Sequence, residues 1–343
     1  MYHGRRRRPR SPVWLAGAVL VVVLGAAAVT VGILRMNDDG GSAPPAAPAI
    51  ANPAPARAPL QQTLEVDPTS GYAAVARASD AGRQALTAQN LAFSNGGKGQ
   101  YGGEVTAYDP GAFDPVRLRR NATQLTVRDH QASFVPDFAF PAAGSGDSRP
   151  YHTDVLGWQD PSGIWVLVYA APGASLPRDE LLRFAAAVTV GPPRELRAPF
   201  RLGPLPDGLT ATYVRSVDIQ SDDLNAATVG LSAAGRRPSG GAVYDAVPPG
   251  VALAITAAVP GKDAPDTPGD LKVAGHDAWY TTGTNPLSAP GAGGKLTVAT
   301  GQCLVTVEAA DRKRTPRADL QRMVAAMTIG DCRDPDTWIP PLS

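Results

Sequence analysis

The sequence has little of the chemistry that catalytic and metal sites require. Its 343 residues include only two cysteines and four histidines, and charged residues make up 18% of the chain. It contains no G-x-S-x-G, H-E-x-x-H, P-loop or dinucleotide-binding pattern, and its two cysteines do not form a C-x-x-C pair. We therefore predict that the protein is not an enzyme and has no catalytic residue, cofactor or metal.

Basic residues are scarce beyond the N-terminus. Residues 1–36 hold six arginines and no acidic residue. Of the 32 Lys and Arg residues, 26 therefore remain in the rest of the chain against all 31 Asp and Glu residues, a net charge of −5. Nucleic-acid binding needs a basic surface, so this composition predicts that nucleic acid is not a partner.

Charge is absent altogether from Val13 to Leu34, a run of 22 residues. A helix of this length spans roughly 33 Å, enough to cross the core of a lipid bilayer. Five arginines precede the run, so the positive-inside rule places residues 1–12 in the cytoplasm as a basic tail. We expect a single-pass protein of the cell membrane, with the bilayer as a partner of the transmembrane helix 13–34 and the C-terminal portion extracellular.

A second interpretation of this segment is a cleaved signal peptide. Ala26-Ala27-Ala28 fits the small-residue pattern of a cleavage site. The apolar run continues to Leu34, however, which favours an uncleaved anchor. No cysteine follows the run, which excludes a lipoprotein.

Residues 35–60 form a linker that is rich in proline and alanine. Proline fixes φ and lacks a donor N–H, so the stretch is predicted to be neither helix nor central strand. As a polyproline rod, some 20 residues would reach on the order of 60 Å. We predict a disordered linker, which is either a spacer through the cell wall or a leash of no set length.

The rest of the chain contains an internal duplication. Leu125–Phe134 reads L-T-V-R-D-H-Q-A-S-F and Leu271–Tyr280 reads L-K-V-A-G-H-D-A-W-Y, so leucine, valine, histidine, alanine and an aromatic recur at the same positions. The same order of features follows both stretches. We therefore expect two exterior units, residues 61–193 and 197–332, followed by a C-terminal tail, 333–343.

Each unit is predicted to end in an amphipathic helix. Pro177 and Pro316 stand near the two helix starts, with Thr315 as the expected N-cap of the second. Apolar residues then follow at i, i+3, i+4 and i+7, which is one buried helical stripe. These residues are Leu181, Phe184, Ala185 and Val188 in the first unit, and Leu320, Met323, Val324 and Met327 in the second.

The segments before these helices are predicted to be mostly strands. Ile164–Ala170, Val251–Val259 and the hairpin from Leu296 to Val307 are apolar and rich in β-branched residues. The alanine-rich stretch Tyr72–Leu91 is predicted to be a helix. The fold class that follows is α+β: an N-terminal transmembrane helix, a Pro/Ala-rich linker, and two repeated units of antiparallel sheet with a C-terminal helix packed on each.

The last strand of each unit has two different faces. In the second unit, Cys303, Val305 and Val307 alternate with Thr306 and Glu308, which predicts one buried and one solvated face. The matching strand of the first unit carries Trp165, Leu167 and Tyr169 on the second face. Our hypothesis is that the other unit covers this aromatic face.

The two cysteines, Cys303 and Cys332, both lie in the exterior portion. Outside the cell they are expected to be oxidised. We predict a disulfide between them that pins the helix of the second unit to its sheet.

His130 and His276 are the obvious candidates for a functional site, because they recur in both copies. One interpretation is a paired site at a pseudo-twofold interface. The other is a polar position near a turn between two strands. Neither histidine has Asp, Glu or Ser at the spacing of a known motif, which favours the second interpretation.

The order of a strand, V-x-x-H-x-A, a second strand, then P-R-x-x-L and A-A-x-T-x-G resembles an uncharacterised actinobacterial family of single-pass membrane proteins. The resemblance implies a duplicated LolA-like or PsbP-like α+β exterior domain. The chain also resembles exterior domains attached to anti-sigma factors, although it lacks a cytoplasmic sigma-binding domain. The resemblance assigns no functional residues.

Two functions agree with these observations. The first is a membrane-anchored extracytoplasmic protein that acts as a non-catalytic binding or interaction module of the cell envelope, with an envelope protein or the wall as its partner. The alternative is a carrier or sensor of an apolar ligand, such as a lipid, held between sheet and helix. An apolar cavity on the order of several hundred Å³ in one unit would support that alternative.

Overall fold

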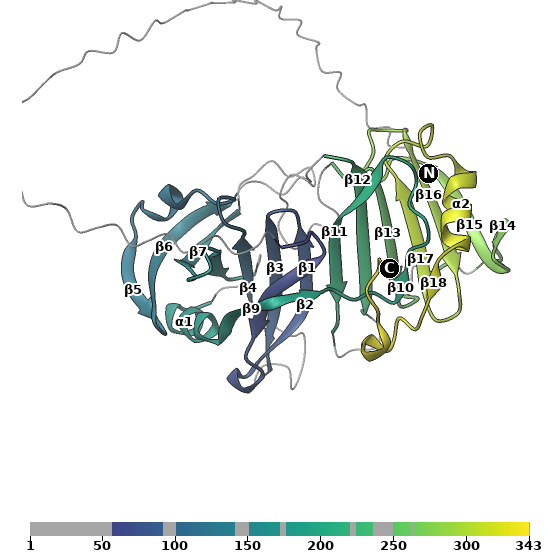
Figure 1. The fold of residues 1–343 in the computed structure, drawn as a ribbon. Helices are drawn as coiled ribbons and strands as arrows, with labels where there is room; N and C mark the ends of the chain where they lie inside the picture. The colour runs from purple at the N-terminus through teal and green to yellow at the C-terminus, as the bar shows by residue number, and fades with distance from the viewer. Residues whose placement is uncertain are drawn as a thin grey trace, which may run out of the picture. The chain divides into compact units, whose positions relative to one another are not determined.

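The computed structural model describes residues 57–91, 101–140, 151–171, 176–219, 224–235, 250–261, 264–265 and 267–342. These residues are mostly β-sheet (Figure 1). A single antiparallel sheet of 14 strands contains strands from both copies of the duplication. Two helices and two short strand pairs accompany it.

The first copy contributes one half of the sheet, one helix and a two-stranded ribbon. Its elements are β1 (Gln61–Val66), β2 (Tyr72–Asp80), β3 (Arg83–Asn90), β4 (Tyr101–Tyr108), β5 (Thr123–Val127), β6 (His130–Phe140), β7 (Tyr151–Gln159), β8 (Trp165–Tyr169), α1 (Arg178–Ala187) and β9 (Val188–Glu195). Two 3₁₀ turns, η1 (Pro68–Ser70) and η3 (Pro115–Leu118), belong to this copy.

The second copy repeats the same series of elements. They are β10 (Phe200–Arg201), β11 (Leu209–Val217), β12 (Ala226–Ala233), β13 (Leu253–Ala258), β14 (Leu271–Val273), β15 (His276–Gly283), β16 (Gly293–Ala299), β17 (Leu304–Ala309), α2 (Arg317–Ala325) and β18 (Thr328–Ile329). The 3₁₀ turn η4 (Pro335–Thr337) follows them.

The strand order shows the duplication directly. From the centre of the sheet outwards it runs β2-β3-β4-β8-β7-β6-β5 in the first copy and β11-β12-β13-β17-β16-β15-β14 in the second. The ribbon β1–β9 corresponds to the pair β10–β18. The two copies therefore share one topology, and their sheets meet where β2 pairs with β11.

The pairing of β2 with β11 corrects the predicted fold class. We expected an α+β fold of two repeated units, but the described residues are mostly β-sheet, and Ala76 to Asp80 pairs in antiparallel register with Val217 to Tyr213 and makes the two sheets one. A strand at the edge of a sheet has unpaired N–H and C=O groups, and here each copy satisfies those of the other. The contact between copies is thus edge to edge through backbone hydrogen bonds.

The predicted helix at Tyr72–Leu91 is wrong for the same reason. This segment is the hairpin of β2 and β3, with a turn at Gly82, whose φ of +101° suits glycine. Alanine has the highest helix propensity, but propensity is a weak determinant of structure, and tertiary pairing overrides it. Here β2 and β3 are bonded to β11 and β4, so the hairpin is completed by strands distant in sequence.

The predicted strands and terminal helices of both copies are otherwise present, with shifted ends. The N-cap of α2 is Pro316, one residue after the expected Thr315. Pro192 and Pro193 do not end the first copy, because β9 continues past them to Glu195. The register of β1 with β9 shifts at this point, and such an irregularity accommodates residues that lack a donor N–H.

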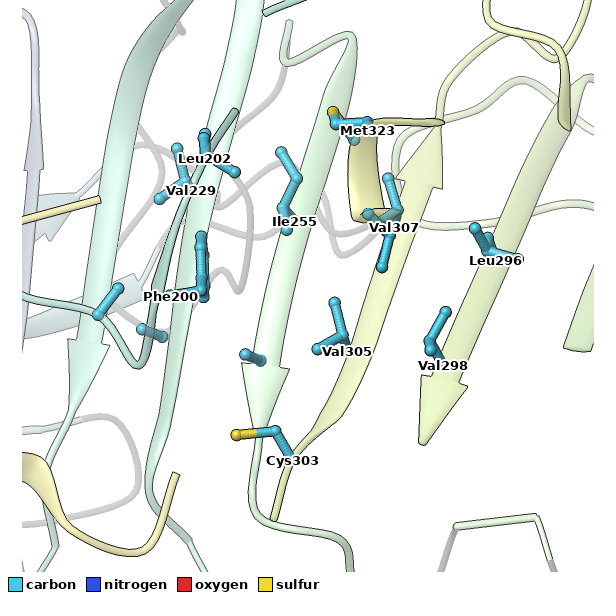
Figure 2. Packing of buried hydrophobic residues seen from close by; sticks show 14 of the residues in the cluster. Phe200, Leu202, Val229, Ile255, Leu296, Val298, Cys303, Val305, Val307 and Met323 are labelled. Atoms are coloured by element: carbon cyan, nitrogen blue, oxygen red, sulfur yellow. The ribbon is translucent and has the colours of Figure 1, made fainter. Parts of the chain in front are cut away.

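Each helix packs on its own half of the sheet. Leu181 and Phe184 of α1 are buried against the first half, and Leu320 and Met323 of α2 against the second. Figure 2 shows Met323 directed towards the sheet face that carries Ile255 and Val307. Two hydrophobic cores thus lie on the side of the sheet that the helices cover.

The opposite face of the first copy is covered by its own chain. Phe113 and Leu118, from the connection that includes η3, pack with Leu167 and Tyr169 in one hydrophobic cluster. The ring centroids of Phe113 and Trp165 are 5.6 Å apart. The hypothesis that the second unit covers this aromatic face is therefore wrong.

The second copy contains the predicted disulfide. Cys303 and Cys332 are bonded, with their Cα atoms 5.4 Å apart. The segment beyond Cys332 is part of the fold, because Trp338 is buried in the core of the second copy and Ile339 bridges to Ala198. The residues predicted to be a C-terminal tail therefore close this core.

Neither helix within the described residues is long and apolar enough to cross a membrane. The predicted transmembrane segment from Val13 to Leu34 lies outside those residues, as do most residues of the predicted linker.

The last residues of the linker are nevertheless part of the fold, because Arg57 is inserted into the sheet. Its side chain is 4% exposed. The guanidinium donates to the backbone carbonyls of Asp80 and Arg83 at 2.8 and 3.0 Å, and it pairs with Asp109 at 3.3 Å. It also donates to Ser79 and to the carbonyl of Gln61. Arg57 is therefore a buried and fully hydrogen-bonded anchor.

We predict that Arg57→Ala lowers the free energy of unfolding by about 3 kcal/mol. The substitution leaves several buried acceptors and the Asp109 carboxylate without their donor, and such losses are costly. Urea titration of both proteins measures the difference. The control is Arg314→Ala, because the Arg314 side chain is 89% exposed. Equal midpoints for the Arg57 variant and wild type would show that the anchor is not structural.

Replacing both Cys303 and Cys332 with alanine is expected to lower the free energy of unfolding by roughly 3–4 kcal/mol, since the bridge closes a loop with a sequence separation of 29. Thermal unfolding with and without reductant provides the measurement. Wild type with reductant should match the double variant, and the variant should not respond to reductant. A reductant effect on the variant would contradict the assignment of the loss to this bridge.

Candidate functional site

A groove of about 510 Å³ lies where the two copies meet. Its lining comes from β1, η1, β2, β9 and β11, from the residues directly after β9 and β11, and from the C-terminal segment around η4. Both copies thus contribute to it. We call it the junction groove; its lining residues are Gln62, Leu64, Glu65, Val66, Pro68, Arg77, Arg194, Glu195, Leu196, Arg197, Ser216, Asp218, Pro335 and Trp338.

Arg77 is the central charged residue of the junction groove. It lies in the middle of β2, and its neighbour across the junction is Ser216 of β11. Burial lowers the pKa of the Arg77 guanidinium, although Asp218 and Glu65 favour its charged form. Among the described residues, no group forms a hydrogen bond or a close ion pair with this guanidinium. The groove therefore contains a partly desolvated cation with unused donors.

Gln62 lines the same groove and has an unpaired oxygen buried behind the groove wall. Its residue is 4% exposed, and its Nε2 donates to the carbonyl of Ala85 at 2.9 Å. Its Oε1 is buried and accepts no hydrogen bond from the described residues. Buried polar atoms are nearly always paired in native proteins, so this unpaired oxygen is an exception at the wall of the groove.

The other lining residues combine charge with apolar surface. Glu65 and Arg194 are 3.0 Å apart, although Glu65 Oε1 has no well-aligned hydrogen bond. Because both side chains are more than a third exposed, we treat this pair as a weak surface ion pair. Val66 and Pro335 are half-buried and provide apolar surface. The groove can thus contact polar and apolar parts of one ligand.

The recurring histidines do not form a site together. His130 begins β6 and His276 begins β15, each directly after a two-residue turn. These strands lie next to opposite edges of the sheet. His130 stacks on Trp158 with ring centroids 6.1 Å apart. The structure therefore agrees with a turn-proximal position and excludes a paired site at the junction.

A second group of perturbed ionisable residues lies on the opposite face of the first copy. Burial raises the pKa of Asp80, whose carboxylate is 3.0 Å from Arg83. Burial also raises the pKa of Tyr169 well above its ordinary value, and its hydroxyl is 2.8 Å from that of Thr106. Tyr169 is only 3% exposed, so this group is a buried structural network.

Within the described residues, no three His, Cys, Asp or Glu side chains gather in an arrangement that could hold a metal ion.

A second groove of about 510 Å³ lies beside α2 and is lined by Leu205, Asp207, Arg314, Arg322 and Met323, among others. Its Arg322 is paired with Asp319. It lacks the buried orphan atoms that distinguish the junction groove.

The space between helix and sheet is filled in both copies. In the first copy a Cβ atom at Gly103 of β4 would lie 2.6 Å from the ring of Phe184 of α1, and in the second copy Leu320 of α2 is buried in one core with Val307 of β17. Phe184 and Leu320 are fully buried. The described residues thus leave no room for an apolar ligand at these two helix–sheet contacts, which is where the carrier hypothesis places it.

The residues of the junction groove were not identified from the sequence. Arg77 is a lone charge within the apolar stretch Val75–Ala78, which was the one available signal. Because the alanine-rich stretch Tyr72–Leu91 predicts a helix, this charge does not indicate a position in a sheet. Gln62 and Trp338 carry no signal, because only the folded chain brings them to the junction.

No protein family matches this chain, and no curated protein matches it. Solved structures that are similar to it include two complexes. One is MucB in complex with MucA(peri), with a TM-score of 0.22, 11% identity, and coverage of 76% of this chain and 93% of that chain. The other is the Pseudomonas aeruginosa MucA/MucB complex, with a TM-score of 0.21, 12% identity and the same coverage. These values are too low to support an argument about fold or function.

We predict that stability falls as the pH rises above about 10 and that Tyr169 contributes to this fall. In the unfolded chain Tyr169 ionises near its ordinary pKa of 10.0, whereas burial keeps it protonated in the folded chain. The unfolded state therefore loses its proton first, and the free energy of unfolding decreases with pH. Urea midpoints from pH 8 to pH 11 measure the slope.

Tyr169→Phe should flatten this alkaline slope and cost about 1 kcal/mol at neutral pH, because it removes the hydrogen bond with Thr106. Thr106→Val is the matched control: it removes the same hydrogen bond but keeps the tyrosine, so the slope should remain. Identical slopes in Tyr169→Phe and Thr106→Val would contradict the prediction.

Proposed function

We propose that the protein is a membrane-anchored, extracytoplasmic binding module of the cell envelope, and that its partner binds in the junction groove. The observation that carries the proposal is a groove, lined by both copies, that contains the half-buried guanidinium of Arg77 without a hydrogen-bond partner among the described residues. Unpaired polar groups destabilise a fold, and natural proteins retain such defects at functional sites.

The position of the groove also supports this function. β2 and β11 belong to different copies, and Arg77 and Ser216 are neighbours only because these strands pair. A single copy would have no such groove. We infer that the duplication was retained because the junction provides a binding surface that neither copy has alone.

The anchoring part of the proposal rests on the sequence. The uncharged run from Val13 to Leu34 and the arginines before it are typical of a single-pass anchor with a cytoplasmic N-terminus. The folded part would then lie outside the cell, where a disulfide between Cys303 and Cys332 is stable. No catalytic chemistry is required of the groove in this proposal.

A carrier of an apolar ligand is less well supported. The junction groove is lined by three arginines and three acidic residues, and the helices are packed closely on the sheet in both copies. Apolar ligands instead select cavities with predominantly hydrophobic walls.

The proposal is tested by photo-crosslinking of the full-length protein in its native membrane. A benzophenone amino acid replaces Arg197, which is exposed at the groove, or Val116, which is 55% exposed and lies outside it. We expect a discrete crosslinked product with a second protein from position 197 and none from position 116. The absence of a product at 197, or the same product from both positions, would refute the junction groove as the binding site.

A further inference from the structure

We propose that the outer edge of β5 is a docking surface for a second copy of this chain, with the two β5 strands paired in antiparallel register. This surface is separate from the junction groove, because no residue of β5 lines the groove. Four observations lead to the proposal: the open edge of β5, its contrast with β14, the pairing at the junction, and the charges around β5.

β5 is the outermost strand of the first half of the sheet, as Figure 1 shows. Among the described residues it pairs only with β6, so one side of the strand has no strand partner there. Alternate residues of an antiparallel strand direct their N–H and C=O groups to opposite sides. Thr123, Gln124 and Thr126 are exposed. The strand thus presents an open edge to which a further strand can bind.

The opposite edge of the sheet is protected in a way that β5 is not. β14 has only three residues, and its central Lys272 pairs with Asp277 at 2.7 Å. A short strand and an edge lysine are two devices by which proteins prevent edge-to-edge pairing. β5 has five residues, T-Q-L-T-V, of which three are β-branched and none is charged or proline. Its composition therefore favours pairing with another strand.

The junction shows that this fold pairs the edges of two copies. β2 and β11 hold the same place in the strand order of their copies, and they pair antiparallel over five residues each. β5 has the same number of residues. A second chain would therefore continue the sheet beyond β5 by the kind of contact that already joins the two copies. Antiparallel pairing of identical strands is closed by a twofold axis, so it gives a dimer.

The charges at the two ends of β5 favour the antiparallel arrangement. Arg119 and Arg120 precede the strand and are exposed. Asp129 follows it, with a side chain that is 85% exposed, and Arg128 leaves that end without net charge. Antiparallel pairing brings Asp129 of each chain towards the arginines of the other. Parallel pairing would instead bring the arginines of both chains together, and like charges side by side are destabilising.

The register that overlaps all five residues is centred on Leu125. Gln124 of each chain then lies opposite Thr126 of the other, roughly 5 Å away. The two Gln124 residues are offset by a further two positions, about 7 Å along the strand. A disulfide requires Cα atoms within about 7 Å of each other in total. Cysteines at positions 124 and 126 should therefore crosslink with each other and not with themselves.

The test places single cysteines in the full-length protein in its native membrane. The two natural cysteines are bonded to each other, so each variant has one free thiol. Gln124→Cys and Thr126→Cys are co-expressed with two different epitope tags, and each is also expressed alone with both tags. After mild oxidation, non-reducing gels and immunoblots measure the product that carries both tags. The control is Lys272→Cys of β14, co-expressed with Thr126→Cys.

We expect the mixture of Gln124→Cys and Thr126→Cys to give at least about tenfold more product than either variant alone. The mixture that contains Lys272→Cys should stay at the background level. Equal yields from the three β5 combinations, or no product from any of them, overturn the proposal. A product of Lys272→Cys with Thr126→Cys means that β5 binds β14 of the next chain, and the twofold pairing is then wrong.

Two charge variants test the same register without a thiol. Gln124→Lys/Thr126→Lys places like charges opposite each other in the dimer, whereas Gln124→Lys/Thr126→Glu places opposite charges there. Both side chains are exposed, so the fold of one chain should be unaffected, and circular dichroism checks this. Sedimentation velocity of the purified full-length proteins in detergent measures the dissociation constant of each dimer.

One strand pair is a small interface, so we expect a weak dimer of the wild type. The Lys/Lys variant should raise its dissociation constant about threefold or more, and the Lys/Glu variant should lower it. Wild type that remains monomeric at the highest concentration, or one dissociation constant shared by all three proteins, contradicts the pairing of β5 with β5.

Discussion

The backbone hydrogen bonds between β2 and β11 are the interaction on which the rest of the structure depends. They join Ala76–Asp80 to Tyr213–Val217 and turn two sheets into one. Without them, each copy would expose the edge of its first sheet strand to solvent and to other chains. The same bonds fix Arg77 beside Ser216 and so create the groove. Stability and the proposed function therefore rest on one strand pair.

The sequence predicts local features of this fold well because they depend on nearby residues. The hairpin from Leu296 to Val307 and the helices after Pro177 and Pro316 have a clear periodicity, and turn or proline signals stand at their ends. The disulfide followed from the presence of only two cysteines in the exterior portion. The duplication itself was readable from Leu125–Phe134 and Leu271–Tyr280.

The pairing of the two copies was not predictable in the same way. β2 is rich in alanine, a residue that favours helix, and the partner that makes it a strand is more than a hundred residues away. The groove depends on that pairing and on the C-terminal segment, whose Trp338 returns to the core. Histidine is rare in this chain, so its recurrence at positions 130 and 276 suggests a site. The two histidines recur because the hairpin turn before each of them is repeated. The residues that line the groove at the junction, such as Arg77 and Trp338, are not part of a repeated sequence pattern.

Arg57 has a mechanical consequence. Its guanidinium donates to the carbonyls of Asp80 and Arg83, which flank the turn between β2 and β3. Tension on the chain ahead of Arg57 is therefore transmitted to the end of β2, the strand that carries Arg77 and joins the two copies. When antiparallel strands are pulled along their length, many of their hydrogen bonds bear the force in shear at the same time, and the strands resist separation. Load from the N-terminal side and occupancy of the groove thus act on the same strand.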